Sequence, residues 1–307
     1  MKCGSQKTKK DGFKNGRQRY RCRDCYAAFQ NNKRNSSISK KLWGGWADRK
    51  QTYRELADDY SKNRYWVQKQ LDQYEVIFPE LLPQETCICM DATDFGGFLV
   101  LVFRSPELKR NLYAKVIHSE TIDEYRAGIK YLIDRGWKIK AIVSDGKGLR
   151  QDFYGIPVQM CQFHQQKIIT KHLTKNPILE ANIELRNISM KLTKTDKESF
   201  DGWISDWYEK WGKFLKERTF NLETGKYHFT HRRTRSAFFS LKRNLDYLFT
   251  FYDYMELNIP NTNNSIEGYF SYLKRKVNVH NGLRKDRKIK LIFHLLFNTK
   301  QPPKNEH

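Results

Sequence analysis

Two kinds of hydrophobic periodicity divide the chain. Between residues 36 and 80, apolar residues recur at helical spacing on both sides of the polar break Ser61–Asn63. The residues concerned are Tyr53, Leu56, Ala57 and Tyr60 before the break, and Val67, Leu71 and Tyr74 after it. The pattern predicts two short helices across a tight turn, which is either a helix-turn-helix or an ordinary helical hairpin.

From residue 84 onward the apolar runs become short and strand-like. They are Thr86–Asp91, Phe98–Arg104, Leu112–His118, Ile139–Ser144 and Val158–Cys161, and a helical stripe at about 122–135 separates the third from the fourth. The fourth run does not alternate with polar residues, which is typical of a central strand. The predicted fold class is α/β, because the order β-β-β-α-β-α-β-α over 84–175 is that of a ribonuclease-H-like mixed sheet.

Helical patterns return in the second half of the chain. Residues 176–260 are rich in Trp, Phe, Leu and Lys at helical spacing, which predicts an all-helical insertion into the sheet domain. Pro260 and the polar stretch Asn261–Ser265 end the insertion, and Asn264 or Ser265 is expected to cap the next helix. We therefore assign 84–175 and 261–300 to one domain that the insertion interrupts.

The charge of the chain indicates a polyanionic partner. There are 57 Lys and Arg against 34 Asp and Glu, a formal net charge of +23, and residues 1–50 alone hold 15 Lys or Arg and 3 Asp, a net +12. Such an excess favours DNA, RNA or anionic lipid as partner. We favour nucleic acid, because no basic amphipathic helix of the kind that lies on membranes stands out in residues 1–50.

The apolar content is sufficient for a packed core but not for a membrane span. Hydrophobic residues make up 39% of the chain and aromatic residues 14%, which argues against wholesale disorder. The longest uninterrupted apolar run, Phe98–Phe103, is far shorter than a transmembrane helix needs, and no signal-peptide pattern follows Met1. We expect a cytoplasmic protein without a membrane partner.

Residues 1–35 predict a zinc-ribbon-like segment. Cys22 and Cys25 form a Cys-x-x-Cys pair, and Cys3 precedes them across a basic, hairpin-like stretch. Outside a βαβ pattern this spacing is typical of zinc binding, although a ribbon needs four ligands and only three thiols are present. The alternative is that these cysteines are ordinary thiols on a basic arm.

Three acidic residues occupy positions typical of a divalent-metal site. Asp91 ends the first strand-like run, Asp145 directly follows the fourth, and Glu267 lies in the first turn of the helix after the insertion. Carboxylates from distant segments hold pairs of Mg²⁺ in enzymes that cut or join phosphodiesters, with Mn²⁺ as an alternative ion. Asp94 competes with Asp91, but alternation along a strand points the two in different directions. Any one Asp is more often a solvated surface residue.

Cys161 and His164 form a second pattern, Cys-x-x-His. It is either half of a zinc site or a buried thiol and a hydrogen-bonded histidine beside an active site. We favour the second interpretation, because no other Cys/His pair lies near in the sequence. In that interpretation His164 positions a phosphate or a water molecule and is a catalytic candidate.

Basic residues in three segments are candidates for DNA contacts. The second helix of the predicted pair presents Arg64, Gln68 and Lys69, whose side chains suit phosphates and base edges. Residues 274–290 hold eight Lys or Arg and one Asp. The further candidates are Arg19 and Arg21 in the N-terminal segment and Lys274, Arg275 and Lys276 after the glutamate.

Taken together, these motifs resemble bacterial insertion-sequence transposases of the Mutator-like type, which carry a DDE catalytic triad. The matching segments are residues 3–5 and 16–25, Met90–Thr93, Val143–Gly146, Cys161–His164 and Asn263–Gly268. Asp145 follows Asp91 by 54 residues and Glu267 follows Asp145 by 122, which leaves room for the insertion. The missing fourth thiol departs from the family's ribbon.

The resemblance implies a DNA transposase. Asp91, Asp145 and Glu267 would hold two Mg²⁺ ions, cleave a strand at the element end and transfer the freed 3′-OH into target DNA. The expected partners are double-stranded DNA and further copies of the chain assembled on it, and the resemblance implies association with the bacterial nucleoid. Two alternatives remain: a DNA-binding regulator without catalysis, and a nuclease for RNA·DNA hybrids, which leaves the N-terminal basic segment less well explained.

Overall fold

The computed structural model describes residues 5, 7–14, 17–30, 37–146 and 153–298. The chain divides into two compact units, residues 1–76 with 282–291 and residues 77–281 with 292–307. Helix α11, Lys285–Asn298, contributes residues to both units. No helix in the described part of the chain is long and apolar enough to cross a membrane.

The first unit contains a small antiparallel sheet and a group of short helices. The sheet has the order β1-β2-β3, formed by Thr8–Lys14, Arg17–Cys22 and Ala28–Gln30. The helical elements are α1 (Ser37–Trp43), a π-helical turn (Gly44–Asp48), α2 (Tyr53–Asp59) and α3 (Arg64–Asp72). The predicted helix pair is therefore present as α2 and α3.

The sequence at the start of each helix explains why α2 and α3 begin where they do. Thr52 and Glu55 form a reciprocal capping box at the start of α2. The Asn63 side chain accepts a hydrogen bond from the Trp66 N–H and so caps α3. Leu56 on α2 and Val67 on α3 are both buried. Their burial orients each helix so that the polar side chains on its other face are exposed.

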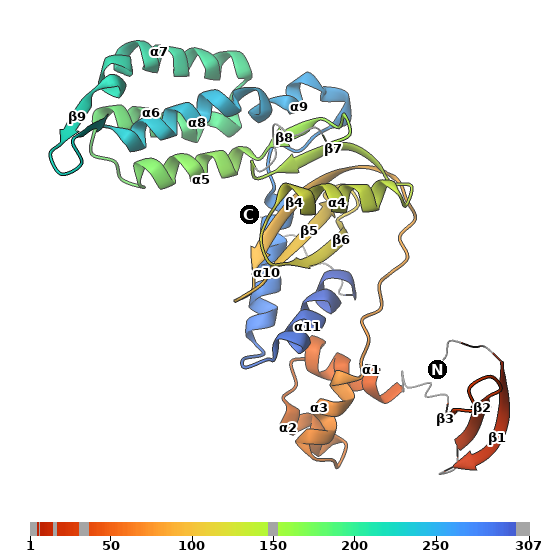
Figure 1. Cartoon of the computed structure of the whole chain (residues 1–307). Helices are drawn as coiled ribbons and strands as arrows, with labels where there is room; N and C mark the ends of the chain where they lie inside the picture. Colours follow the sequence, from red (N-terminus) through yellow and green to blue (C-terminus); the bar gives the residue numbers. More distant parts are fainter. Residues whose placement is uncertain (1–4, 6, 15–16, 31–36, 147–152, 299–307) are drawn as a thin grey trace. The chain divides into compact units, whose positions relative to one another are not determined.

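The second unit is built on a five-stranded mixed sheet with the order β6-β5-β4-β7-β8 (Figure 1). The strands are β4 (Glu85–Asp94), β5 (Leu99–Ser105), β6 (Arg110–Ile117), β7 (Lys138–Ser144) and β8 (Val158–Met160). β4 pairs antiparallel with β5 and parallel with β7, and is the central strand. All five predicted strands are present, with ends that differ by at most three residues, so the α/β prediction is confirmed at this level.

Local sequence accounts for the β4–β5 hairpin and the following helix. Gly96 and Gly97 both have positive φ, +80° and +87°, which the tight turn requires and a side chain would strain. Helix α4, Ile122–Ile133, follows β6 and buries Tyr125, Ile129 and Leu132. The sequence also predicts a helix between β7 and β8. The described residues of that connection, 145–146 and 153–157, are not helical, and residues 147–152 lie outside the described part.

The prediction of an all-helical insertion is wrong in one part. Helices α6 (Glu180–Lys191), α7 (Lys197–Lys216) and α8 (Arg232–Leu248) are present, but a hairpin of β9 (Arg218–Asn221) and β10 (Lys226–Phe229) separates α7 from α8. Asn221 accepts hydrogen bonds from the Glu223 and Thr224 N–H groups, and Gly225 has φ +63°. This turn chemistry, together with the tilted aromatic pair Phe220–Tyr227 across the strands, favours the hairpin over a continued helix.

Buried glutamines join the insertion to the sheet. Helix α5 spans Gln162–Leu173 and packs against α8 beside the β8 edge (Figure 1). The amides of Gln159 and Gln162 donate to the Leu248 carbonyl, and the Gln165 amide donates to Ser240 Oγ. Each bond satisfies a buried polar group, so the insertion is held at β8 by specific hydrogen bonds as well as by apolar packing.

Candidate functional site

Asp91 lies on β4, and Asp145 directly follows the neighbouring parallel strand β7 at the same level of the sheet. Cys89 on β4 is opposite Val143 on β7 in the parallel register, and the two aspartates each follow by two residues. The carboxyl group of Asp91 is buried, with 9% of the residue exposed, and its Oδ1 accepts a hydrogen bond from the Ala92 N–H at 2.8 Å. Asp94, the competing candidate, is exposed and caps the turn at the Gly96 N–H.

Glu267 is brought to the sheet by helix α10, Asn264–Asn278. Asn263 is the N-cap residue, not Asn264 or Ser265 as the sequence suggested, and its side chain makes no cap hydrogen bond. Its amide instead donates to the Met90 carbonyl at 3.2 Å. Ser265 Oγ accepts a hydrogen bond from the buried Arg104 guanidinium on β5 at 2.9 Å. These two bonds anchor the first turn of α10 beside β4.

The three predicted acids interact electrostatically. Burial is the main cause that raises the pKa of Asp91 to about 7, and the negative charges of Asp145, Glu120 and Glu267 raise it further. No ion pair in the described part of the chain involves Asp91. The result is a buried carboxyl group among further acids, an environment that a divalent cation would neutralise.

Glu120 is an acidic neighbour that sequence reasoning missed. It follows β6 by three residues and accepts a short hydrogen bond from the hydroxyl of the buried Tyr125. Burial first, and then Asp145 and Glu120, raise the pKa of that Tyr125 hydroxyl. The available signal was the one used for Asp145, an acidic residue just after an apolar strand-like run.

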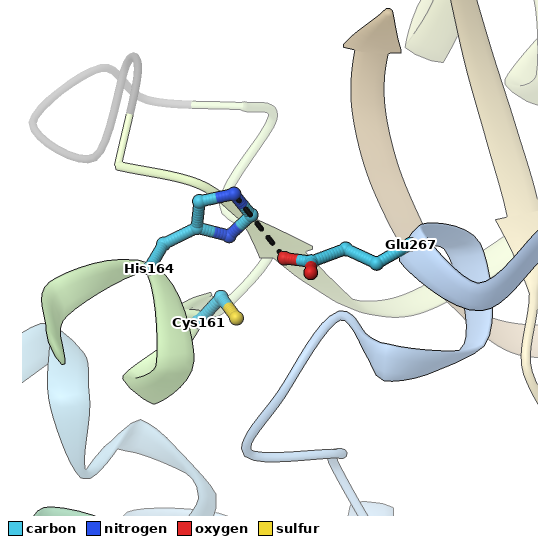
Figure 2. A group of neighbouring side chains, drawn as sticks. All are labelled: Cys161, His164 and Glu267. Carbon is cyan, nitrogen blue, oxygen red and sulfur yellow. Dashed lines mark ion pairs between the residues drawn. The ribbon is translucent and has the colours of Figure 1, made fainter. Parts of the chain in front are cut away.

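Cys161 and His164, at the start of α5, lie close to Glu267. Figure 2 shows the three side chains pointing toward one another, two from the start of α5 and one from α10. His164 Nε2 is 3.3 Å from Glu267 Oε1, and Lys167 Nζ is 2.9 Å from Glu267 Oε2. Burial lowers the pKa of His164, while the Glu267 carboxylate opposes that shift. Sequence reasoning placed His164 near the acids but did not find Lys167.

The predicted DNA-binding residues differ in how accessible their charges are. On α3, Arg64 and Lys69 are exposed and Gln68 is half-buried. On α10, Lys274 and Arg275 are exposed and Lys276 is half-buried. Arg19 and Arg21 on β2 both form ion pairs with Asp11, at 3.0 and 3.2 Å, so their guanidinium groups are engaged within the small sheet.

The predicted zinc ligands are only partly within the described residues. Cys22 is buried at the end of β2, Cys25 is exposed in the turn that follows, and neither forms a disulfide bond within the described residues. The Cys22 N–H donates to the Ala27 carbonyl, and the Arg23 N–H donates to the Lys7 carbonyl. Cys3 lies outside the described residues.

No protein-family model matches the sequence, and no curated protein sequence matches it.

Proposed function

We propose that this chain is a DNA transposase of the DDE type, which cleaves strands at element ends and transfers them into target DNA. The observation that carries the proposal is the mutual placement of Asp91, Asp145 and Glu267 around the central strand, together with the raised pKa of Asp91. The sheet order, with two parallel and two antiparallel pairings around β4, agrees with a ribonuclease-H-like catalytic domain.

The donor set fits Mg²⁺. Asp91, Asp145 and Glu267 offer hard carboxylate oxygens, the ligands that Mg²⁺ prefers, and Glu267 Oε1 is a buried acceptor without a hydrogen bond. Two Mg²⁺ ions held by these residues would supply nucleophile activation and neutralisation of charge at the phosphate. Without metal, the Lys167 ammonium neutralises Glu267, whereas Asp91 is accommodated by taking up a proton.

In this proposal the remaining residues of the site bind DNA and orient Glu267. Lys167 is half-exposed and holds Glu267 Oε2, which leaves Oε1 directed toward His164. His164, partly exposed beside this carboxylate, is placed to contact a DNA phosphate or a water molecule. The exposed bases of α10, Lys274 and Arg275, extend positive charge along the helix that carries Glu267, and α3 offers Arg64 and Lys69. This distribution favours DNA over a small anionic substrate.

The test is strand cleavage by the full chain on a supercoiled plasmid that carries the DNA flanking this gene. We expect Mg²⁺-dependent nicks that leave a 3′-OH, and loss of nicking by at least about 100-fold in Asp91→Asn, Asp145→Asn and Glu267→Gln. Glu198→Gln is the matched control, since Glu198 is exposed on α7. Glu107 is unsuitable as a control, because it accepts hydrogen bonds from Thr86 and Lys140.

DNA binding measured alongside separates the alternatives. Retained binding with no metal-dependent nicking in the wild-type protein would identify a DNA-binding regulator. Cleavage confined to RNA·DNA hybrids would identify a hybrid nuclease.

A further inference from the structure

Three donor atoms of different chemistry converge where α5 and α10 meet. Cys161 Sγ, a ring nitrogen of His164 and a carboxylate oxygen of Glu267 all lie within 4.8 Å of one another (Figure 2). Cys161 and His164 share the first turn of α5, whereas Glu267 comes from the first turn of α10. The sequence offered only the Cys-x-x-His half of this group, and the fold supplies the third member.

Two of these side chains carry buried atoms that have no hydrogen-bond partner. They are His164 Nδ1 and Glu267 Oε1. The Glu267 oxygen lies 3.3 Å from His164 Nε2, but the contact lacks hydrogen-bond geometry. Leaving a buried polar atom unsatisfied costs about 1–3 kcal/mol. Glu267 Oε1 faces His164 Nε2 without a hydrogen bond, so a cation held between these two atoms would satisfy the carboxylate oxygen.

The ligand set suits a thiophilic ion such as Zn²⁺. Thiolate, imidazole and carboxylate bind zinc at about 2.0–2.3 Å, so tetrahedral coordination separates the ligand atoms by roughly 3.3–3.8 Å. The distance of 3.3 Å between His164 Nε2 and Glu267 Oε1 already meets that requirement. The full set needs a contraction of about 1 Å from its limit of 4.8 Å. A thiolate and a carboxylate together would balance the charge of one divalent ion.

The surroundings orient the sulfur and leave the proper oxygen for the ion. Burial raises the pKa of the Cys161 thiol, and the Asn263 N–H, which donates to Cys161 Sγ at 3.1 Å, opposes that shift. Lys167 holds Glu267 Oε2, so Oε1 remains for coordination. Asp145 and Glu120 act electrostatically on His164 and favour a nearby cation. A thiolate is a poor ligand for Mg²⁺, which separates this site chemically from the acids at Asp91.

We propose that Cys161, His164 and Glu267 form a site for Zn²⁺ or a similar thiophilic divalent ion, with a fourth position open to solvent. Glu267 belongs to both donor sets, and one carboxylate cannot satisfy both ions fully. Zinc at this site therefore prevents Glu267 from binding Mg²⁺ together with Asp91 and Asp145, and so inhibits the Mg²⁺-dependent reaction. The inhibitory role rests on the proposed function, whereas the zinc site itself does not.

The binding test uses the full chain with Cys22→Ser and Cys25→Ser, so that the N-terminal Cys-x-x-Cys pair does not contribute to the signal. Co²⁺ serves as a spectroscopic substitute for Zn²⁺, and we expect a thiolate-to-Co²⁺ charge-transfer band that excess Zn²⁺ abolishes. Adding Cys161→Ser should remove the band, whereas adding Cys87→Ser, another buried thiol outside the cluster, should leave it. Absence of the band in the Cys22→Ser, Cys25→Ser protein overturns the proposal.

Two further variants keep the test decisive if Cys161→Ser fails to fold. His164→Asn and Glu267→Gln remove a ligand from partly exposed positions, and each should weaken Zn²⁺ binding by at least about tenfold in a competitive chelator titration. Circular dichroism checks that each variant is folded. Unchanged zinc affinity in both folded variants would also overturn the site.

The activity test compares the fractional inhibition of plasmid nicking by Zn²⁺, each variant being measured against its own rate in Mg²⁺ alone. We expect inhibition of the wild-type protein at Zn²⁺ levels that saturate the Co²⁺-competition assay, and at least about tenfold weaker inhibition in Cys161→Ser. Zinc binding without any nicking contradicts only the proposed transposase activity. Nicking without zinc binding contradicts only the zinc site.

Discussion

The side-chain amide of Asn263 donates a hydrogen bond to the carbonyl oxygen of Met90, one residue before Asp91. Asn263 is fully buried, and its backbone N–H is used by Cys161 Sγ. One residue thus connects the central strand, the start of α5 and the start of α10. The three acidic residues lie on segments that are distant in sequence, and this connection holds two of the segments together.

Replacing Asn263 by Ala should separate those segments and lower stability. Losing the buried bond to Met90 should reduce the free energy of unfolding by about 1–3 kcal/mol. Nicking in Mg²⁺ should fall more than DNA binding, because Glu267 loses its fixed position. Denaturant unfolding and the plasmid assay measure both effects. Asn278→Ala, at the exposed end of α10, is the control and should change neither.

The raised pKa of Asp91 predicts how the metal-free protein responds to pH. An unfolded aspartate titrates near pH 4, whereas Asp91 in the folded protein has a pKa of about 7. Between these values the folded state holds a proton that the unfolded state has released, so rising pH destabilises the fold. From pH 5 to pH 8 the wild type should lose about 2–3 kcal/mol relative to Asp91→Asn.

Mg²⁺ should reduce that difference, because a bound cation favours the ionised carboxyl group. Thermal unfolding of both proteins at the two pH values, with EDTA and with Mg²⁺, provides the measurement. Parallel pH profiles of the wild type and Asp91→Asn in EDTA would contradict the shifted titration.

The N-terminal thiols are predicted to hold one zinc ion. Cys22 ends β2 and Cys25 lies in the following turn, so both sulfurs belong to one short loop, as zinc ligands commonly do. Native mass spectrometry of the full chain should lose one Zn²⁺ in Cys25→Ser and retain it in Cys87→Ser. Since Cys25 is exposed, its replacement should not disturb packing. Unchanged zinc content would show that these thiols are not ligands.

Helix α3 is predicted to contact DNA through its exposed face. Arg64→Ala and Lys69→Ala should each weaken binding and reduce the slope of log affinity against log salt by about 1, as expected for one lost phosphate contact. Fluorescence anisotropy with duplex DNA at several salt concentrations measures the slope. Arg54→Ala removes a guanidinium charge from an exposed position on α2 and should leave the slope unchanged.

An ion pair within the first unit joins α3 to α11 and predicts that a fragment without α11 is less stable. Both Nε and Nη2 of Arg287 donate to Asp72 Oδ1, at 2.9 and 2.8 Å, and Nη1 donates to the Tyr53 hydroxyl. Arg287 is buried but Asp72 is partly exposed, so Asp72→Asn should cost about 1–3 kcal/mol. Asp58→Asn, on the exposed face of α2, should cost little. A fragment of residues 1–80 lacks Arg287 and should melt below the full chain.

Local sequence determined much of the secondary structure. Apolar runs located the five strands and α4, because a strand or helix that buries one side must carry apolar residues at the matching period. The same logic located α2 and α3. It did not find β9 and β10, since strands of four residues between two long helices carry too little periodicity and depend on the turn at Asn221 and Gly225.

Sequence also located some charged residues of the candidate site and missed others. Asp91 and Asp145 could be selected from sequence, since each closes an apolar run and parallel strands present such ends at one edge of a sheet. Glu120 follows an apolar run as Asp145 does but was not singled out, whereas nothing in the sequence around Lys167 distinguishes it from a solvated charge.

Sequence alone determined which segments form strands and helices, and which acidic and thiol residues lie at their ends, because these features depend on neighbours along the chain. Only the tertiary structure decided that Glu267 meets the Cys161–His164 pair and acts electrostatically on Asp91. That meeting depends on Asn263 bonding to Met90 and on Arg104 bonding to Ser265. Such contacts join residues far apart in sequence, and their partners are set by the packing of the whole second unit rather than by any local pattern.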